Sequence, residues 1–494
     1  MSENKLSRRD LLRTGAVLTL APAVVPLVEA GLQDKAPPAG SSCPPGGGSI
    51  PLSNVRNLFA FSRANPLRVP MNAANLCPTF ECITELVDER TADLDRDVSF
   101  QNRQTRYFPL LNLARQRVAD QIGIADCDLA LVRNTSEANN IIANGIPLND
   151  GDKVLLWTEN HPTNYHSWFF RRARELANRR NISIVCVTLP TPAPGRDLTR
   201  QMILDTFRPL IERHKPRVVA FSEVSNVSGV RLPAREICAR AHQVRQDTFV
   251  HVDGAQSWGA LHLDLDDMGC DSFSASAHKW YCGPRETGIL YIRRKWLQNE
   301  GALSRFWPSV IAYDLYIALP CQEGDIHLCQ AQQATLANDV VLPDAGMLES
   351  WTAALQDCQL DCNLWKFARR FETLGQRDDA AITALAETAD LHRRIGPANI
   401  QRFVAGLANS LKSRLRECRG VTVTTPMNAE VSHAVVVAQL PNETGAIRAY
   451  NELYTAGIAG ARSGNRGIRL CPHMYNNESD IQAAVAVIRR VAGC

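Results

Sequence analysis

Residues 248–256 read Thr-Phe-Val-His-Val-Asp-Gly-Ala-Gln, an apolar run that closes on a carboxylate at Asp253 and an amide at Gln256. A second run, Ser276-Ala-His-Lys279, places a lysine beside a hydroxyl and an imidazole. Polar residues directly after a β-branched run are typical of the carboxyl edge of an open α/β sheet, where ligands bind. These two runs therefore predict both the fold class and the place of a site.

Short apolar runs alternate with helical patterns around these motifs, from about residue 100 to 295. The strand candidates are 129–132, 153–157, 182–187, 218–221, 248–252 and 288–292, and the helix candidates are 136–144, 164–180, 199–213 and 233–246. This alternation predicts a mostly parallel sheet with helices on both faces. We expect residues 100–309 to form one large α/β domain.

The rest of the chain divides into shorter parts. The stretch 310–365 breaks the alternation and is expected to be an insertion or an interdomain region. Beyond it, the helical patterns and strand-like runs at 378–417, 421–425, 434–440, 444–456 and 478–491 predict a smaller α+β domain over residues 366–494. Residues 54–99 are expected to form an N-terminal segment that packs with the small domain.

The first residues differ in composition from the rest. Ser7-Arg-Arg-Asp-Leu-Leu-Arg13 resembles the twin-arginine export motif, an apolar stretch follows at 16–28, and Val28-Glu-Ala30 suits a cleavage site. We therefore expect residues 1–30 to be a signal peptide. A permanent membrane anchor is the alternative, but the apolar stretch is shorter than the roughly 20 residues a spanning helix needs. The Pro, Gly and Ser content of residues 31–53 predicts a flexible linker.

The expected location is periplasmic or secreted, with export of the folded protein by the twin-arginine machinery. The 54 basic and 51 acidic residues leave a net charge of +3, which gives no electrostatic footprint for nucleic acid. The odd count of 15 cysteines suits mostly buried small apolar side chains. One or two disulfides are expected among Cys321, Cys329, Cys358 and Cys362. No metal site is predicted, because the close Cys358 and Cys362 pair lacks a matching second pair.

The chemistry follows from the residue types at the strand ends. A carboxylate at Asp253 would keep a buried pyridine ring protonated, and so an electron sink. A lysine such as Lys279 forms Schiff bases with carbonyls when its amine is deprotonated, which a neighbouring cationic ring would favour. Together these two residues indicate pyridoxal 5'-phosphate.

Three further strand ends offer groups that such a cofactor needs. Asn134-Thr-Ser-Glu-Ala138 supplies hydroxyls and backbone N–H groups at a helix N-terminus, which suits a phosphate. His161 could stack on the ring, and Asn226 could hydrogen-bond its phenolic oxygen. Taken singly, each group has a plainer interpretation as a turn residue, a helix cap or a surface charge. The order and spacing of all five strand ends favour the cofactor site.

The run Asp253-Gly-Ala-Gln256, followed by Ser276-Ala-His-Lys279-Trp-Tyr-Cys-Gly-Pro284 and Thr287-Gly-Ile-Leu-Tyr291, resembles the class V aminotransferase family. The resemblance extends over about residues 70 to 490 and implies the pyridoxal-phosphate-dependent transferase fold type I. It implies a large domain with a mostly parallel, seven-stranded type of sheet, a smaller α+β C-terminal domain and a homodimer.

The resemblance also implies a role for each motif residue. Lys279 would carry the cofactor as a Schiff base, Asp253 would pair with the pyridinium, and His161 would stack on the ring. Gln256 would contact the phenolic oxygen, and Asn226 would also face the ring. The phosphate ligands would be Thr135, Ser136, Ser276 and His278.

The segment Gly467-Ile-Arg-Leu-Cys-Pro-His-Met-Tyr-Asn476 is also similar to the family, in which the arginine at the position of Arg469 binds the substrate carboxylate. A planar guanidinium suits that bidentate task. Arg462 is a second candidate for this role, and a surface ion pair is the plainer interpretation.

Two departures from the family pattern matter. The loop 461–466 lacks the nucleophilic cysteine that desulfurases carry there, which disfavours persulfide chemistry. Gln376 stands where family members commonly have the threonine that binds the neighbouring subunit's phosphate. The glutamine amide can still donate a hydrogen bond, but the substitution weakens the argument for a site shared within a dimer.

The motifs leave the reaction open. Loss of the α-proton from a bound amino acid gives a stabilised carbanion, with Lys279 as the general base. Reprotonation leads to transamination or epimerisation, and expulsion of a β-substituent makes the enzyme a C–S or β-lyase. The resemblance is closest to the isopenicillin N epimerase-like branch, which implies an amino acid, or the amino-acid part of a peptide or secondary metabolite, as substrate.

Two other classes of protein remain as alternatives. A non-catalytic binding protein on the same fold would not need Lys279, Asp253 and His161 together. A metal-dependent hydrolase would need a close His/Asp ligand spacing, which the sequence lacks.

Overall fold

The computed structural model describes residues 43–44, 47–193, 195–297, 368–372 and 374–493. Residues 42–494 form one compact unit. The expected signal peptide, the 310–365 stretch and the four cysteines within it lie outside the described residues. None of the helices in these ranges is long and apolar enough to cross a membrane.

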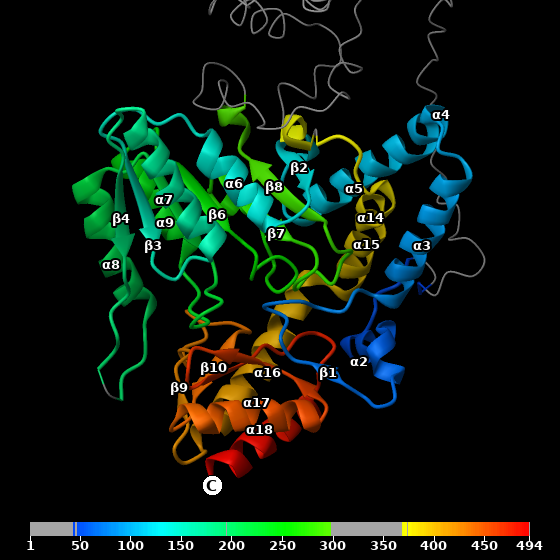
Figure 1. The fold of residues 1–494 in the computed structure, drawn as a ribbon, viewed down its shortest axis with the longest axis vertical. Helices are drawn as coiled ribbons and strands as arrows, with labels where there is room; N and C mark the ends of the chain where they lie inside the picture. The colour runs from blue at the N-terminus through cyan, green and yellow to red at the C-terminus, as the bar shows by residue number, and fades with distance from the viewer. Residues whose placement is uncertain (1–42, 45–46, 194, 298–367, 373, 494) are drawn as a thin grey trace, which may run out of the picture. The chain divides into compact units, whose positions relative to one another are not determined.

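A seven-stranded sheet forms the centre of the larger part (Figure 1). Its order is β2-β8-β7-β6-β5-β3-β4, with bounds β2 Leu129–Val132, β3 Lys153–Trp157, β4 Ser183–Val187, β5 Val218–Ser222, β6 Phe249–Asp253, β7 Ser272–Ser276 and β8 Gly288–Ile292. Strand β8 runs antiparallel to both of its neighbours, β2 and β7, and the other pairs in this sheet are parallel. The prediction of a mostly parallel sheet is therefore confirmed.

Both faces of the sheet are buried. Successive residues of a strand point to opposite faces, and the residues on each face lie in an apolar core. Leu155 and Trp157 of β3 lie in one apolar core, while Val154 and Leu156 lie in the other. The first core is covered by α5 Phe108–Gln121, α8 Arg200–His214, α9 Ala234–Val244 and α15 Leu385–Ile395, and the second by α6 Thr135–Gly145 and α7 Pro162–Ala177. The larger part thus has three layers.

The C-terminal part has its own sheet, in the order β12-β13-β10-β9 and antiparallel throughout. Its strands are β9 Thr422–Val423, β10 Val436–Gln439, β12 Ala461–Ser463 and β13 Gly467–Leu470, and its helices are α16 Pro397–Arg416, α17 Glu443–Thr455 and α18 Glu478–Ala492. Helices α17 and α18 lie side by side (Figure 1). A third apolar core fills this α+β unit.

The predicted helical region 378–417 consists of three helices, α14 Asp379–Thr383, α15 and α16. Gly396 has a φ of 88°, and Pro397 occupies the first turn of α16. A residue with positive φ cannot continue a right-handed helix, and proline prefers the first turn. The chain therefore breaks between α15 and α16, and α16 begins in a new direction.

The N-terminal segment contacts both parts. Its elements are α2 Leu52–Val55, β1 Val69–Pro70 and α3 Glu81–Arg96, and the short α4 Phe100–Asn102 follows it. Another short helix, α10 Leu265–Met268, belongs to the larger part and precedes β7. Strand β1 pairs in parallel with β11 Ile458–Ala459 of the C-terminal part. In α3, Arg90 forms an ion pair of 3.0 Å with Glu387 of α15. The segment therefore packs on the larger part as well as on the small one.

A disulfide joins Cys43 to Cys82 of α3. Ile50 is buried, and its N–H donates to the carbonyl of Arg394 at 3.0 Å. The prediction of a flexible linker up to residue 53 is therefore wrong for its last residues, because the disulfide and this apolar contact anchor them.

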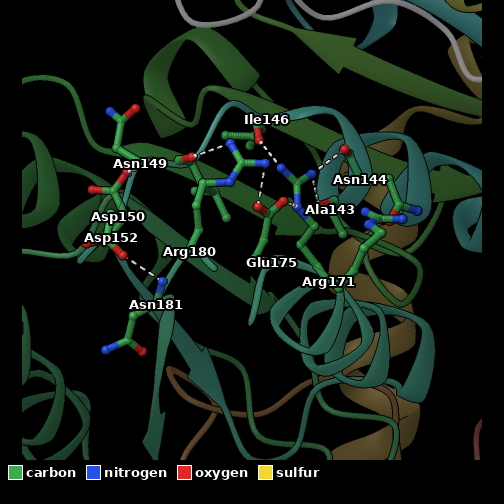
Figure 2. Close-up of polar contacts among 12 residues, drawn as sticks. Ala143, Asn144, Ile146, Asn149, Asp150, Asp152, Arg171, Glu175, Arg180 and Asn181 are labelled. Atoms are coloured by element: carbon green, nitrogen blue, oxygen red, sulfur yellow. Dashed lines mark hydrogen bonds and ion pairs between the residues drawn. The ribbon is translucent and has the colours of Figure 1, made fainter. Parts of the chain in front are cut away.

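A buried charge network joins helices α6 and α7 (Figure 2). The Arg171 guanidinium donates to the carbonyls of Ala143, Asn144 and Ile146 at the C-terminal end of α6, and it pairs with Glu175. Arg180 approaches the other oxygen of that carboxylate at 2.6 Å. A cation at this end of α6 complements the helix dipole, whose positive end lies at Thr135.

Candidate active site

Lys279 lies in a tight turn after β7. The turn is closed by hydrogen bonds from Cys282 N to the Lys279 carbonyl at 3.0 Å and from Gly283 N to the Ala277 carbonyl at 2.9 Å. Burial lowers the pKa of Lys279, and the positive charge of Arg469 adds to this, while Asp253 opposes it. The fold thus favours the neutral amine, which is the nucleophilic form.

Asp253 is the last residue of β6, and it is buried. Its Oδ1 accepts from the Ala255 N–H and its Oδ2 from Asn139 Nδ2, both at 3.0 Å. These two donors fix the direction of the carboxylate. Each oxygen keeps a second lone pair, so the carboxylate can still accept a bond from a ring N–H.

Asn139 of α6 connects this carboxylate to a buried polar network. Its Oδ1 accepts from Ser274 Oγ at 2.6 Å and lies 2.9 Å from His251 Nε2. Its Nδ2 also donates to Thr163 Oγ1 at 3.2 Å. Burial lowers the pKa of His251 to about 3, so the ring is neutral. The amide uses all four of its hydrogen-bonding positions, which fixes its orientation.

His161 is the N-cap of α7. Its Nδ1 lies 2.9 Å from Thr163 Oγ1. Burial lowers the pKa of His161, the charge of Lys279 lowers it further, and that of Asp253 opposes both. The imidazole therefore lies near both catalytic candidates, and its lowered pKa favours the neutral form, which suits stacking on a cationic ring.

The candidate phosphate site lies where α6 begins beside the end of β7. Ser276 Oγ accepts from the Thr135 N–H at 2.7 Å and lies 2.6 Å from Thr135 Oγ1. Gly288 permits this close approach, because a Cβ there would lie 2.6 Å from the Ala275 carbonyl oxygen and 3.0 Å from Asn134 Cα. Ser136, half-buried, follows in the first turn. Hydroxyls and free N–H groups at a helix N-terminus suit a phosphate.

His278 precedes Lys279 and is half-buried. Burial lowers its pKa to about 4, and the charges of Lys279 and Arg285 add to this. A neutral imidazole can still donate one N–H to a phosphate oxygen.

Gln256 is held by two partners. Its Nε2 donates to the Ala74 carbonyl at 3.1 Å, and its Oε1 accepts from Trp280 Nε1 at 2.7 Å. One N–H of the amide remains for a ligand. The structure therefore places this residue as a link between the β6 loop, the N-terminal segment and the lysine turn.

Arg469 of β13 reaches the site from the C-terminal part. Its Nη1 donates to the Asn226 carbonyl at 2.9 Å and its Nη2 to Asn72 Oδ1 at 3.1 Å. Its Nε is buried and has no hydrogen-bond partner within the described residues. A buried unsatisfied donor is costly, so this guanidinium is suited to an anionic ligand. The contact to Asn226 also brings the half-buried Asn226 to the same place.

Arg462 is in a different environment. It is exposed on β12 and donates to Glu443 Oε1 at 3.1 Å and to the Asn465 carbonyl at 2.9 Å. Gln376 is likewise exposed, and its amide donates to the Arg377 carbonyl at 3.1 Å. The structure thus brings Arg469, but not the guanidinium of Arg462, into the electrostatic surroundings of Lys279.

Two residues of the site were missed from sequence, Asn139 and Thr163. Asn139 shares an α6 face with Ile142 and Ala143, and all three are buried. A single amide on an apolar helix face, one turn after a candidate phosphate-binding motif, is the signal that could have revealed it.

The donor set fits a phosphorylated pyridine aldehyde. A lysine of lowered pKa, a buried carboxylate, an imidazole and a hydroxyl-rich helix N-terminus are the groups that this cofactor needs. None of these groups would repel the cofactor by carrying the wrong sign of charge.

Comparisons with known proteins agree with this fit. Residues 81–303 match the family model for class V aminotransferases. Isopenicillin N epimerase of Streptomyces clavuligerus is 26% identical, with 78% of this chain and 85% of that protein covered. The epimerase of Amycolatopsis lactamdurans is 22% identical, with 87% of this chain and 96% of that protein covered. A probable cysteine desulfurase of Pseudomonas putida is 33% identical over 39% of this chain and 44% of its own length.

Solved structures share the fold. An apo cysteine desulfurase from Thermococcus onnurineus superposes with a TM-score of 0.67 and 20% identity, covering 90% of this chain and 100% of that one. A mutant of C-DES with glycine covalently linked to its pyridoxal-phosphate cofactor gives a TM-score of 0.67 and 17% identity, covering 88% and 98%. Residues 81–303 of this chain therefore match the class V aminotransferase family of pyridoxal-phosphate-dependent enzymes, and the described residues have the fold type I architecture.

Proposed function

We propose that this enzyme epimerises or transaminates an amino acid, or the amino-acid part of a peptide or secondary metabolite. The observation that carries the proposal is the buried Nε of Arg469, which has no hydrogen-bond partner among the described residues. The charge of the same guanidinium lowers the pKa of Lys279, so the two side chains lie close enough to act on one substrate. A substrate carboxylate at Arg469 would place an α-amino group and an α-hydrogen toward the lysine. The length of the match to isopenicillin N epimerases supports this choice of substrate class.

The chain's own residues would act as follows. Arg469 binds and orients the substrate carboxylate through its Nε and one Nη. Asp253, held by Asn139 and the Ala255 N–H, keeps the ring nitrogen protonated. Lys279 Nζ would accept the α-proton of the bound substrate. The cofactor, when bound, supplies the electron sink for the negative charge that this proton transfer leaves.

A C–S or β-lyase is the second candidate. The similarity to cysteine desulfurases supports it, although it covers less than half of this chain. Cys471, near Arg469, is buried, and burial raises its pKa to about 11. Such a thiol is a poor nucleophile, so any C–S cleavage would release sulfur without a persulfide on this residue.

The test begins with the absorption spectrum of the purified protein beside that of Lys279→Ala, before and after borohydride. A yellow band in the wild type that borohydride fixes to Lys279 is expected. Candidate amino acids and short peptides are then added in D₂O, with and without a keto acid. Deuterium at Cα with inversion indicates epimerisation, and a keto product indicates transamination.

Release of sulfide or of an unsaturated product would favour the lyase. A wild-type protein that stays colourless with added cofactor would contradict the whole proposal and leave the non-catalytic binding protein as the alternative.

We further propose export by the twin-arginine route to the periplasm or the exterior, and assembly as a homodimer. The Cys43–Cys82 disulfide supports the first, because disulfides persist in oxidising compartments. The exposed amide of Gln376 could contribute to a neighbouring subunit's site. Fractionation of cells carrying Arg8→Lys/Arg9→Lys and sedimentation of the mature protein test the two proposals.

A further inference from the structure

Three buried side chains gather behind the lysine turn without a part in the proposed reaction. They are Cys77 of the N-terminal segment, Cys282 of the turn and His473, which follows β13. Their sulfur and ring nitrogen atoms all lie within 4.8 Å of one another. Cys77 is 4% exposed, and the other two are fully buried.

The backbone fixes both cysteines against the turn that carries Lys279. The Cys77 N–H donates to the His278 carbonyl at 2.9 Å, and the Cys282 N–H donates to the Lys279 carbonyl at 3.0 Å. Cys282 has a φ of 49°, in the left-handed region where glycine is the unstrained residue. A side chain held in that conformation is consistent with a need for its thiol.

The histidine presents a free lone pair. His473 Nε2 lies 2.6 Å from the Trp280 carbonyl oxygen, which can only accept, so Nε2 carries the proton. Nδ1 is then unprotonated, and it is buried without a partner among the residues described. Histidine ligands of metals usually donate their other N–H to a carbonyl in this way. Tyr475 Oη, which donates to Cys77 Sγ at 3.4 Å, would stabilise a thiolate there.

We propose that Cys77, Cys282 and His473 form a binding site for a thiophilic metal ion, Zn²⁺ or Cu⁺. Two sulfurs and an imidazole are donors that these ions prefer. Bonds of about 2.3 Å to sulfur and 2.0 Å to nitrogen place the ligand atoms of a tetrahedral site roughly 3.5–3.8 Å apart. From separations of up to 4.8 Å, the ligand atoms would have to approach one another by at most about 1 Å to reach that spacing.

Binding would release the two thiol protons, and the two thiolates would balance the charge of Zn²⁺. The ion would join the N-terminal segment, the lysine turn and the C-terminal part. Its role is structural, since an ion that binds only the folded state stabilises that state. The site does not depend on which reaction the enzyme catalyses.

The competing use of the same sulfurs is a Cys77–Cys282 disulfide, formed by loss of two protons and two electrons to an external disulfide. That bond would remove both thiolate donors. The Cys43–Cys82 disulfide shows that a nearby pair of cysteines does join. The experiment therefore counts thiols before it adds metal.

The test uses the mature holoenzyme, with its metal content measured as isolated. After treatment with a chelator, its thiols are counted and it is titrated with Co²⁺ and, anaerobically, with Cu⁺. We expect saturation at one equivalent per chain, a sulfur-to-cobalt charge-transfer band and a rise in melting temperature. Mass spectrometry of the protein as isolated then distinguishes zinc from copper.

We expect two variants to lose the charge-transfer band, Cys77→Ser and Cys282→Ser. His473→Gln is expected to lose the band or to weaken and shift it. Cys238→Ser, which removes a buried free cysteine of α9, is expected to keep it. The cobalt spectrum of the wild type alone tests for sulfur ligands. The proposal therefore remains testable even if a variant does not fold. A fully reduced wild type without a thiolate band, or a Cys77–Cys282 disulfide in the protein as isolated, would overturn the proposal.

Discussion

Asn139 Nδ2 donates to Asp253 Oδ2 at 3.0 Å, and the Oδ1 of the same amide accepts from Ser274 of β7 and lies 2.9 Å from His251 Nε2 of β6. The carboxylate is therefore held by a helix that also forms the candidate phosphate site. In Asn139→Leu, His251 and Ser274 lose a buried acceptor, at a cost of about 1–3 kcal/mol for each group left unsatisfied. We expect weaker cofactor binding. We also expect the cofactor's absorption band to change with pH at a different midpoint from that of the wild type.

Equilibrium dialysis and a pH series of spectra measure both effects. Asn140→Ala changes the exposed neighbouring amide on the same helix and serves as the control. If Asn139→Leu binds and titrates like the wild type, the network has no influence on the cofactor.

Replacement of Arg469 tests the carboxylate site. In Arg469→Gln the charged donors are lost, and a hydrogen bond to a charged group contributes about 1.5–3 kcal/mol. We expect the KM for amino-acid substrates to rise about 10- to 100-fold, with a smaller change in kcat. Arg462→Gln removes a surface guanidinium from the same sheet and is expected to leave KM unchanged. Equal effects of the two substitutions would contradict the assignment.

Two substitutions are expected to shift the pKa of Lys279 in opposite directions. Arg469 lowers this pKa and Asp253 raises it. In cofactor-free protein, Arg469→Met is therefore expected to raise the pKa of Lys279, so that acylation of its amine requires a higher pH. Asp253→Asn is expected to lower it and to extend acylation to lower pH. Mass spectrometry after brief reaction with acetic anhydride at several pH values measures both shifts, and a common direction would disprove the electrostatic account.

Arg171 tests the junction of α6 and α7. Arg171→Met leaves Glu175 without its inner partner and leaves the last carbonyls of α6 without a donor. Removal of one partner of a buried ion pair typically costs about 3–5 kcal/mol. Urea denaturation should show that loss, whereas Arg174→Met, an exposed position on α7, should stay near the wild type. A small loss for Arg171→Met would mean that water replaces the guanidinium.

Gly229 tests the loop that carries Asn226. Its φ is 76°, and a Cβ there would lie 2.0 Å from the Val435 carbonyl oxygen. Gly229→Ala is expected to cost about 2–4 kcal/mol, from left-handed strain and overpacking together. Gly151→Ala has a similar φ of 81° but open space around it, and should show the strain alone. Thermal unfolding compares the two, and equal losses would show that the loop adapts to the extra methyl group.

The sequence predicts much of this fold because most strands of the large sheet are β-branched and end at polar motifs. The predicted bounds of β2, β3 and β8 agree with the structure. Strand β7 was missed because Ser272-Phe-Ser-Ala-Ser276 contains neither β-branched residues nor a charged face. Its serines are buried and bond to neighbouring side chains, and such pairing depends on residues far away in the sequence.

The sequence predicts candidate residues where one motif carries one proposed role, as at Lys279 and Asp253, and the structure brings these two close enough to interact electrostatically. The site was not predictable where a role depends on tertiary contacts. Asn139 became visible only when α6 was placed across β6. The disulfide partner of Cys43 lies in α3, and nothing in the spacing of the two cysteines indicates the pair.

Helix α16 belongs to two cores at once. Ile400 and Val404 in its first half lie in the core of the larger part, while Leu411 and Leu415 near its end lie in the core of the C-terminal part. With 20 residues it is about 30 Å long. Because one helix packs in both cores, any change in its tilt about the first half would also shift the C-terminal core, which includes Ile468 and Leu470 on either side of Arg469.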